Sequence, residues 1–229
     1  MQITISKELT DKIPCFFISA YTFELVEKNN QESLSTSITQ AFLDITKKYQ
    51  SLYQLSDVVA IEKIKKTRDG YKKLGKDPSH TRPACEALVR RIIRDGAIYR
   101  LGDAIDIGNI ISLLTMKSVC MVDAEKLKGN VYIRVGTKED FYEGIGRGII
   151  NVEHLPLYCD ELSPFGNPTS DTKRTAISKD TKKILIMLIH FDEDIKEDEQ
   201  MMLECLNKYL TITNLTLVKV YNEVNKDDE

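Results

Sequence analysis

The segment Ile184-Leu-Ile-Met-Leu-Ile-His-Phe191 contains the longest apolar run in this 229-residue chain. A strand that is buried on one face alternates apolar and polar side chains, whereas this segment is apolar at both alternating positions. It therefore predicts a strand that is covered on both faces, in the interior of a sheet. The run is only about a third of the length that a helix needs to cross a bilayer.

Helical periodicity dominates the first half of the chain. In residues 34–52, apolar side chains recur every three or four positions and would form one buried stripe along a helix. The same spacing recurs in three further segments before the apolar strand and in one segment after it. We expect helices over residues 34–52, from 56 to about 70 or 75, and over 83–94, 105–115 and 196–210.

Residues that prefer helix ends mark several of these boundaries. Ser56 is expected to cap the second helix, because a serine hydroxyl can accept a hydrogen bond from an unpaired amide of the first turn. Gly70 or Gly75 would end that helix, and Gly96 would end the third. Pro83 suits the first turn of the third helix, where its missing N–H costs nothing.

In the second half of the chain the apolar period changes towards two. This period predicts short strands, which glycine-rich or polar turns separate. Because helices and strands do not alternate regularly, the sequence predicts an α+β fold, sandwich-like, with a mixed and largely antiparallel sheet flanked by helices. No linker or repeat divides the chain, so we expect a single domain over residues 1–229. The other strands are expected over residues 2–6, 15–21, 119–122, 131–135, 155–158, 175–178 and 211–221.

Composition and charge narrow the functional classes. The contents of 42% apolar and 29% charged residues are typical of a globular protein with a packed core. The net charge of −3 argues against RNA binding by bulk attraction, although lysines and arginines concentrate between residues 63 and 100. The N-terminal residues resemble no secretion signal, so we expect a cytoplasmic protein without a membrane partner.

The sequence lacks the common motifs for metals and cofactors. Its five cysteines and three histidines are scattered, without the close pairs of a zinc site, so we expect no metal ligands. It has no GxxxxGK[ST], GxGxxG, GxSxG or HExxH motif, which argues against nucleotide-driven motors, dinucleotide enzymes, α/β-hydrolase esterases and zincins. We therefore expect no cofactor.

Two polar segments are candidates for a binding site. Residues 163–175 combine prolines and a glycine with short polar side chains, and such a rigid loop can hold the polar end of a small ligand. The same side chains could equally bond the local backbone as Asx or Ser/Thr turns. In residues 76–91 a helix begins beside basic residues and would favour an anion. Glu86 and Arg90 there have the spacing of an ordinary surface ion pair.

Three blocks of sequence resemble a known family. They are residues 79–91, residues 105–113 and the pattern Asn167-x-x-x-Asp171-Thr172-x-x-Thr175, and together they span about residues 71–178. The chain resembles a free-standing form of the B3/B4 domain, which is also found in the beta subunit of bacterial phenylalanyl-tRNA synthetase. In the synthetase this domain hydrolyses tyrosine that is mischarged onto the tRNA for phenylalanine.

The resemblance implies a cleft for an aminoacyl group and a partner that is tRNA or aminoacyl-tRNA. Asp171 would orient water or the amino group, while Asn167 and Thr172 would hold the carbonyl; these are the three implied catalytic residues. Ester hydrolysis of this kind needs a positioned water and donors for the oxyanion, without a protein nucleophile. The implied substrate-binding residues are Glu86, Asn109, Ser170 and Thr175, and the implied RNA phosphate-binding residues are Lys76, Arg82 and Arg90.

The sequence departs from the synthetase pattern at two positions of the editing pocket. Cys120 stands where the synthetase carries histidine, and Pro168 stands where it carries glutamate. The resemblance therefore supports a shared fold more firmly than a shared reaction. Two other functions stay open. One is a non-catalytic domain that binds a free amino acid or related metabolite, which the acidic pI of about 5.8 favours; the other is a structural module whose polar loop is only a turn.

Overall fold

The apolar segment forms an interior strand of an antiparallel sheet in the computed structural model, which describes residues 1–26 and 31–224. This strand, β10, pairs with β2 on one side and with β3 on the other. The four strands, in spatial order, are β11 (Ile212–Leu217), β2 (Phe17–Leu25), β10 (Lys183–His190) and β3 (Val119–Asp123).

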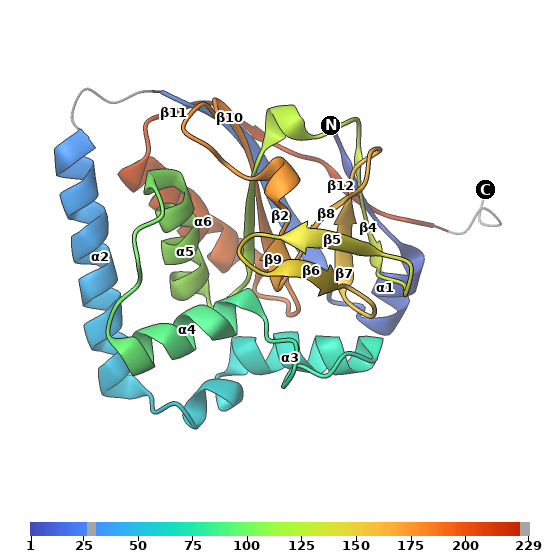
Figure 1. Ribbon diagram of the computed structural model, residues 1–229, viewed down its shortest axis with the longest axis horizontal. Coiled ribbons are helices and arrows are strands. Elements are labelled where there is room, and N and C mark those ends of the chain that lie inside the picture. Colours follow the sequence, from blue (N-terminus) through green and yellow to red (C-terminus); the bar gives the residue numbers. More distant parts are fainter. Residues whose placement is uncertain (27–30, 225–229) are drawn as a thin grey trace.

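A second, six-stranded sheet is mixed. Its first three strands run parallel to one another, and each later strand is antiparallel to the strand before it. A separate ribbon of β5 (Phe141–Gly144) and β6 (Gly148–Asn151) lies over this sheet (Figure 1) and bridges to it between Gly144 and Thr172. The six strands are, in order, β12 (Val220–Asn222), β1 (Ile3–Ile5), β4 (Val131–Val135), β7 (Pro156–Cys159), β8 (Pro164–Asn167) and β9 (Ser170–Asp171).

Helices cover the outer face of the four-stranded sheet. Of these, α5 and α6 contact its strands, while α2 and α4 pack against α5 (Figure 1). Two further helices, α1 and α3, contact each other beside the six-stranded sheet. The helices are α1 (Lys7–Lys12), α2 (Gln31–Leu52), α3 (Glu62–Leu74), α4 (Ala84–Asp95), α5 (Asp103–Thr115) and α6 (Ile195–Tyr209), with short 3-10 turns η1 (Asp57–Ala60), η2 (Ala124–Lys126) and η3 (Lys173–Thr175).

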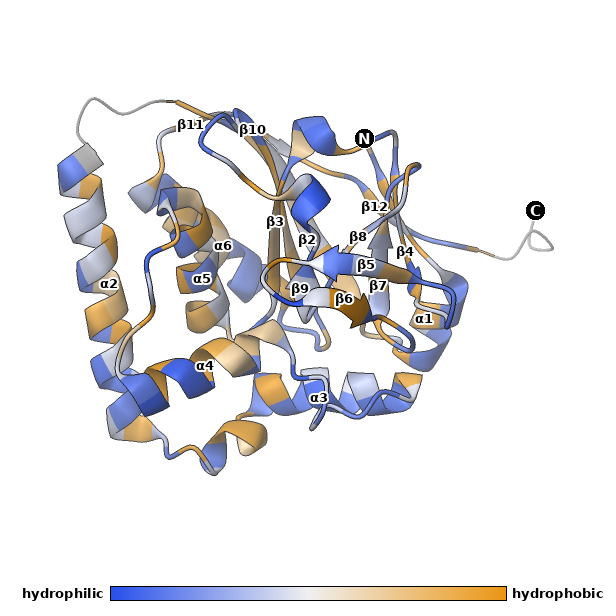
Figure 2. Cartoon of the chain, viewed as in Figure 1, coloured by the Kyte–Doolittle hydropathy of each residue, from blue (hydrophilic) through white to orange (hydrophobic). Residues whose placement is uncertain are grey.

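β10 contributes to both parts of the hydrophobic core. Leu185, Met187 and Ile189 join the cluster between the two sheets, whereas Ile186 and Leu188 join the cluster under the helices. Successive side chains of a strand point to opposite faces, so a strand between two apolar layers must be apolar at both positions. Figure 2 shows the corresponding apolar colouring of the central strands. The fold is therefore α+β, with mixed and antiparallel sheets and flanking helices, as expected.

Three local predictions from the sequence are wrong. Residues 175–178 form no strand, because Thr175 ends the 3-10 turn η3. The predicted strand 211–221 is two strands, and β11 and β12 belong to different sheets. Ser56 does not cap a helix, because its own backbone is helical (φ −64°, ψ −31°) and its hydroxyl donates instead to the Asp57 carboxylate.

The glycine boundaries agree better with the structure. Gly75 and Gly96 end α3 and α4 in the left-handed conformation that glycine adopts without strain. The helix α3 continues through Gly70, where a Cβ atom would lie 2.3 Å from the Phe191 ring. Gly70 thus permits close packing of α3 against the core. Among the helices of residues 1–26 and 31–224, none has the length and apolar character that crossing a bilayer requires.

Candidate functional site

The polar segment 163–175 folds into the β8–β9 hairpin followed by η3, and Asn167 holds its turn together. Asn167 Oδ1 accepts hydrogen bonds from the backbone N–H groups of Thr169 (2.8 Å) and Ser170 (3.1 Å). Asn167 Nδ2 donates to Tyr142 Oη (2.7 Å), and that hydroxyl donates to the Ser170 carbonyl (2.5 Å). The Asx turn that the sequence allowed is therefore present, and it also attaches the β5–β6 ribbon to the hairpin.

A small pocket of about 30 Å³ lies beside this hairpin. One water molecule needs roughly 10–15 Å³ on this measure, so the pocket has room for one or two waters or a group of similar size. Its wall is fixed by Pro168, whose carbonyl accepts hydrogen bonds from Ala84 N (2.9 Å) and Ser118 Oγ (2.8 Å). The lining residues are Ala84, Ser118, Val119, Cys120, Tyr158, Asn167, Pro168, Ser170 and Asp171.

Asp171 is the acidic group of this pocket. Its carboxyl lies over Gly166 of the neighbouring strand, where a Cβ atom would come within 2.6 Å of Asp171 Oδ1. Burial raises the pKa of Asp171 to about 7, and a hydrogen bond from the Cys120 thiol opposes part of that rise. The residue as a whole keeps some exposure, so the burial concerns the carboxyl group. An acid with this pKa exchanges its proton near neutral pH.

Tyr158 and Cys120 complete the inner wall of the pocket. Tyr158 is fully buried, and its hydroxyl has no hydrogen-bond partner within the described part of the chain. Burial, and then the charge of Asp171, raise the pKa of Cys120 well above its usual value. Cys120 therefore carries a protonated thiol and not a reactive thiolate. The sequence indicated a strand at Tyr158 but no functional role, because its neighbours in the pocket come from distant segments.

The two threonines of the motif lie outside this pocket. Thr172 Oγ1 donates to the Glu143 carbonyl (3.2 Å) and accepts from Arg174 N (3.4 Å) at the start of η3. Thr175 is fully buried, and its hydroxyl has no hydrogen-bond partner among the residues that the structure describes, although Thr175 does not line the pocket. Asn109, on α5, is likewise absent from the lining. Of the four predicted substrate-binding residues, only Ser170 reaches the pocket.

Glu86 is a buried structural carboxylate. It is fully buried on α4 and pairs with Arg68 of α3 (2.7 Å), Arg90 (2.7 Å) and Arg82 (3.3 Å). The pair with Arg90 was expected at the surface, but its Glu86 carboxylate is buried, and the three arginines reach it from positions that keep some exposure. The cluster joins α3 to α4, because Arg68 of α3 reaches the buried Glu86 carboxylate of α4, and a buried charge needs cationic partners.

The three predicted phosphate-binding residues differ in how far bonds within the protein already occupy their side chains. Lys76 Nζ donates to the Glu153 carbonyl (2.9 Å), and Arg90 also donates to the Leu55 carbonyl (3.2 Å). Among the described residues, Arg82 pairs only with Glu86, at the longer distance of 3.3 Å, and its side chain is 47% exposed. Arg82 is therefore the best placed of the three to meet an external phosphate.

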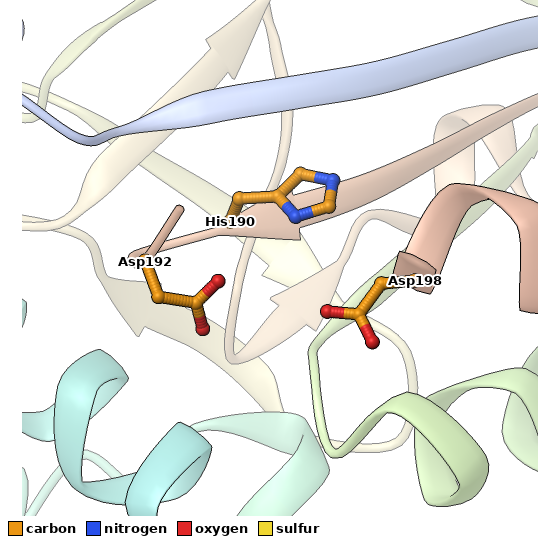
Figure 3. A group of neighbouring side chains, drawn as sticks. All are labelled: His190, Asp192 and Asp198. Carbon is orange, nitrogen blue, oxygen red and sulfur yellow. The ribbon is translucent and has the colours of Figure 1, made fainter. Parts of the chain in front are cut away.

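A second polar cluster lies at the end of β10 and contains Lys117, His190, Asp192 and Asp198 (Figure 3 shows the last three). Lys117 is 1% exposed, and its Nζ lies 2.9 Å from His190 Nδ1 and 2.7 Å from Asp198 Oδ2, and pairs with Asp192. Burial and this ammonium lower the pKa of His190 to about 3. The imidazole is therefore neutral, with Nδ1 accepting from Lys117 and Nε2–H donating to Ser19 Oγ (3.0 Å).

The three acceptors of this cluster are arranged as metal ligands could be. One ligand atom each of His190, Asp192 and Asp198 lies within 4.8 Å of the others. The Lys117 ammonium, however, donates to His190 and Asp192 and forms an ion pair with Asp198, and so takes the position that a cation would need. The cluster is thus built as an internal ion network between the start of β3, the end of β10 and α6.

Comparison with known proteins identifies the family. A family model described as "B3/4 domain" matches residues 66–204. No curated protein sequence matches significantly. Among solved structures, the fold is similar to an N-terminal fragment of the phenylalanyl-tRNA synthetase beta-subunit from Pyrococcus horikoshii, with a TM-score of 0.51 and 14% identity. The likeness covers 97% of this chain but 52% of the fragment, so the chain spans about half of that structure. Since the family model matches more than half of the sequence, the chain belongs to the B3/4 domain family.

Proposed function

We propose that this protein binds the aminoacyl end of a tRNA at the pocket beside Asp171 and hydrolyses a mischarged ester there, in trans. The observation that carries the proposal is the buried Asp171 carboxyl, which lines a pocket in the hairpin that holds the family motif. Family membership and the likeness to a synthetase fragment support a tRNA-related role. Such a protein would work in the cytoplasm, where aminoacyl-tRNA is made and used.

The dimensions of the pocket suit the small polar end of a substrate. A volume of about 30 Å³ accommodates a water molecule or an amino group but not a whole amino-acid side chain. In this proposal Asp171 contacts the ligand, and Ser170 lies beside it on the pocket wall. Asn167 and Thr172 act through the hairpin, because their side chains already bond the local backbone. Positioning of this kind matters, since a displacement of about 1 Å can cost about 10²-fold in rate.

The tRNA backbone would approach from the exposed side of α4. Arg82 lies two residues before the start of α4, whose first residue, Ala84, lines the pocket. A phosphate contact at Arg82 is independent of nucleotide sequence and weakens with added salt. Glu86, Lys76 and Arg90 would then support the shape of this region through their internal bonds.

A second candidate function is the binding of a free amino acid or related metabolite without RNA. The observation in its favour is electrostatic. The chain has a net charge of −3, and two of its three candidate phosphate ligands, Lys76 and Arg90, are bonded within the protein. In that case the same pocket would take its ligand directly from solution.

The test is release of labelled amino acid from a panel of matched and mischarged aminoacyl-tRNAs. We expect selective release by the wild type and a loss of about 10²-fold or more in Asp171→Asn. The exposed Asp180→Asn is the matched control and should keep full activity. If no aminoacyl-tRNA is hydrolysed and tRNA does not bind at low salt, the editing function is wrong. The metabolite-binding function then takes its place.

A further inference from the structure

The buried aspartates and glutamates of the described residues share one property: each has a cationic partner. In each pair the side-chain nitrogen of the cation lies within 3.5 Å of a carboxylate oxygen. This is the expected arrangement, because a buried charge without a partner is strongly unfavourable. The pairs are Glu86 with Arg68, Arg82 and Arg90; Asp106 with Arg100; Asp123 with Lys126; Asp160 with Arg174; Asp192 with Lys117; and Asp198 with Lys63 and Lys117.

Asp171 is the exception. Its carboxyl is buried, but no lysine, arginine or histidine within residues 1–26 and 31–224 pairs with it. Among the described side chains, its recorded hydrogen-bond partner is the neutral Cys120 thiol. The fold therefore holds a buried acid whose counter-charge is not supplied by the described chain, and this acid opens onto a pocket.

A second observation at the same place points to a ligand. The Tyr158 hydroxyl is fully buried and lacks a hydrogen-bond partner among the described residues, and Tyr158 lines the same pocket. Leaving a buried hydroxyl unbonded costs about 1–3 kcal/mol, so such groups in native proteins usually have a partner. A small donor between Asp171 and Tyr158 would satisfy both residues.

We propose that the pocket beside Asp171 is a binding site for a primary ammonium group, such as the α-amino group of an amino acid or aminoacyl ester. A volume of about 30 Å³ suits an ammonium head but excludes a planar guanidinium with its three nitrogens. A divalent metal ion would need more oxygen ligands than one carboxylate supplies. Ammonium carries three donors and no acceptor, so it matches a carboxylate and a hydroxyl oxygen.

This inference deepens the proposed function but does not require the RNA. It predicts that the ligand must have a free amino group, because an N-acyl group would remove the charge and exceed the space. It therefore assigns Asp171 to substrate binding through the amino group. The attacking water of any ester hydrolysis would lie elsewhere on the bound ester.

Methylammonium is the sharpest probe, because it carries little besides the ammonium group. The best very small ligands gain about 1.5 kcal/mol per heavy atom, so its Kd can be about 10 mM at best. We would titrate methylammonium chloride into ¹⁵N-labelled protein and follow the backbone amide signals, with sodium chloride at equal ionic strength as the control. A second titration compares glycinamide with N-acetylglycinamide.

We expect saturable shifts at Ser170, Asp171 and Cys120 with methylammonium and glycinamide, and none with N-acetylglycinamide or sodium chloride. Asp171→Asn should weaken glycinamide binding about tenfold or more. Tyr158→Phe should weaken it less, because the charge remains. The control Asp180→Asn should leave it unchanged.

Two results would overturn the site: no saturable shift with either amine, or equal binding by Asp171→Asn and the wild type. The outcome is separate from that of the deacylation test. If the amines bind but no aminoacyl-tRNA is hydrolysed, the ammonium site stands and the proposed reaction is wrong. If tRNA is deacylated while N-acetylated and free aminoacyl esters react equally, the reaction stands and the ammonium site is wrong.

Discussion

At the scale of single residues, the buried carboxyl of Asp171 destabilises the folded protein at high pH. Its pKa is raised to about 7 from 3.8, because burial disfavours the charged carboxylate. An acid with a raised folded-state pKa destabilises the fold fully above that pKa. The effect fades as the pH falls and vanishes below the unfolded-state value. A shift of this size corresponds to about 4 kcal/mol at most.

The first prediction follows from this sign. Asp171→Asn should be more stable than the wild type by about 2–4 kcal/mol at pH 8. The difference should fall below about 1 kcal/mol at pH 4, where the wild-type carboxyl is protonated in most folded molecules. Urea unfolding at the two pH values measures the difference. Lower stability of Asp171→Asn at pH 8 would show that the folded protein stabilises the carboxylate.

The comparison must be made between proteins at each pH, because His190 has the opposite pH dependence. Its pKa is depressed to about 3 from 6.5, so the unfolded chain takes up a proton that the folded protein excludes. The stability from neutral His190 is therefore complete above pH 6.5 and is lost as the pH falls towards 3. This loss is common to the wild type and Asp171→Asn, so it cancels in their difference.

Gly166 allows the Asp171 carboxyl to lie where it does. It pairs with Tyr158 on one side and Asp171 on the other, and a Cβ atom there would lie 2.6 Å from Asp171 Oδ1 and 3.0 Å from the Tyr158 ring. The second prediction is that Gly166→Ala displaces the carboxyl, abolishes glycinamide binding and costs about 1–3 kcal/mol through overpacking. Amide titration and urea unfolding measure both effects. Unchanged binding would mean that Asp171 has room to shift without loss of the site.

Residue-level roles could be predicted only in part from the sequence. The family pattern pointed to Asp171, and the structure places it in a pocket. Tyr158, Gly166 and Lys117 carried no signal, because their importance depends on neighbours brought together by strand pairing and helix packing. Glu86 was recognised as one half of an ion pair, but its burial by three arginines depends on how α3 packs against α4.

At the scale of elements, strong periodicity was a good guide and short strands were not. The helices α2, α4, α5 and α6 lie close to their predicted ranges, because each has a long apolar stripe. The ribbon β5–β6 and the hairpin β8–β9 were missed as strands, since each strand has only two to four residues. Such short strands are stabilised by pairing and packing more than by their own residues.

The third prediction concerns Lys117, which links the loop after α5 to β10 and α6. Replacing this lysine by methionine leaves Asp192 and His190 (Figure 3) without their cationic partner, while Asp198 keeps its pair with Lys63. Breaking a buried pair costs about 3–5 kcal/mol, so Lys117→Met should be destabilised by about that amount. Zn²⁺ accepts histidine and carboxylate ligands, and these three lie close enough together. We therefore expect Zn²⁺ to raise the Tm of Lys117→Met and EDTA to reverse this.

The wild type is the first control, because its lysine already occupies the cation position and Zn²⁺ should leave its Tm unchanged. The double variant Lys117→Met/Asp192→Asn is the second control. It lacks one ligand and should respond more weakly to Zn²⁺ than Lys117→Met. An equal Zn²⁺ response in the wild type would show that the ion binds elsewhere.

At the scale of the whole molecule, two hydrophobic clusters meet on the two faces of β10. The sequence predicted such a strand, because a run that is apolar at both alternating positions must be covered on both sides. It could not predict that a second sheet covers one face, because layer order is set by contacts between distant segments. The prediction of a single domain over residues 1–229 makes a further claim, namely that the two clusters unfold together.

The fourth prediction tests that claim with two neighbouring residues. Met187 belongs to the cluster between the sheets and Leu188 to the cluster under the helices, and both are fully buried. Each replacement by alanine should cost about 2–5 kcal/mol, because it removes buried methylene and methyl groups and leaves a cavity. If the clusters share one cooperative unit through β10, either variant should shift the single unfolding transition of the whole protein. Urea unfolding followed by tyrosine fluorescence and by far-ultraviolet circular dichroism should then give coincident curves.

Two separated transitions, with Met187→Ala shifting one and Leu188→Ala the other, would show that the helical layer and the sheet layer are separate folding units. The polar pocket would then belong to the sheet unit together with the first turn of α4, so its ligand would stabilise one transition and not the other.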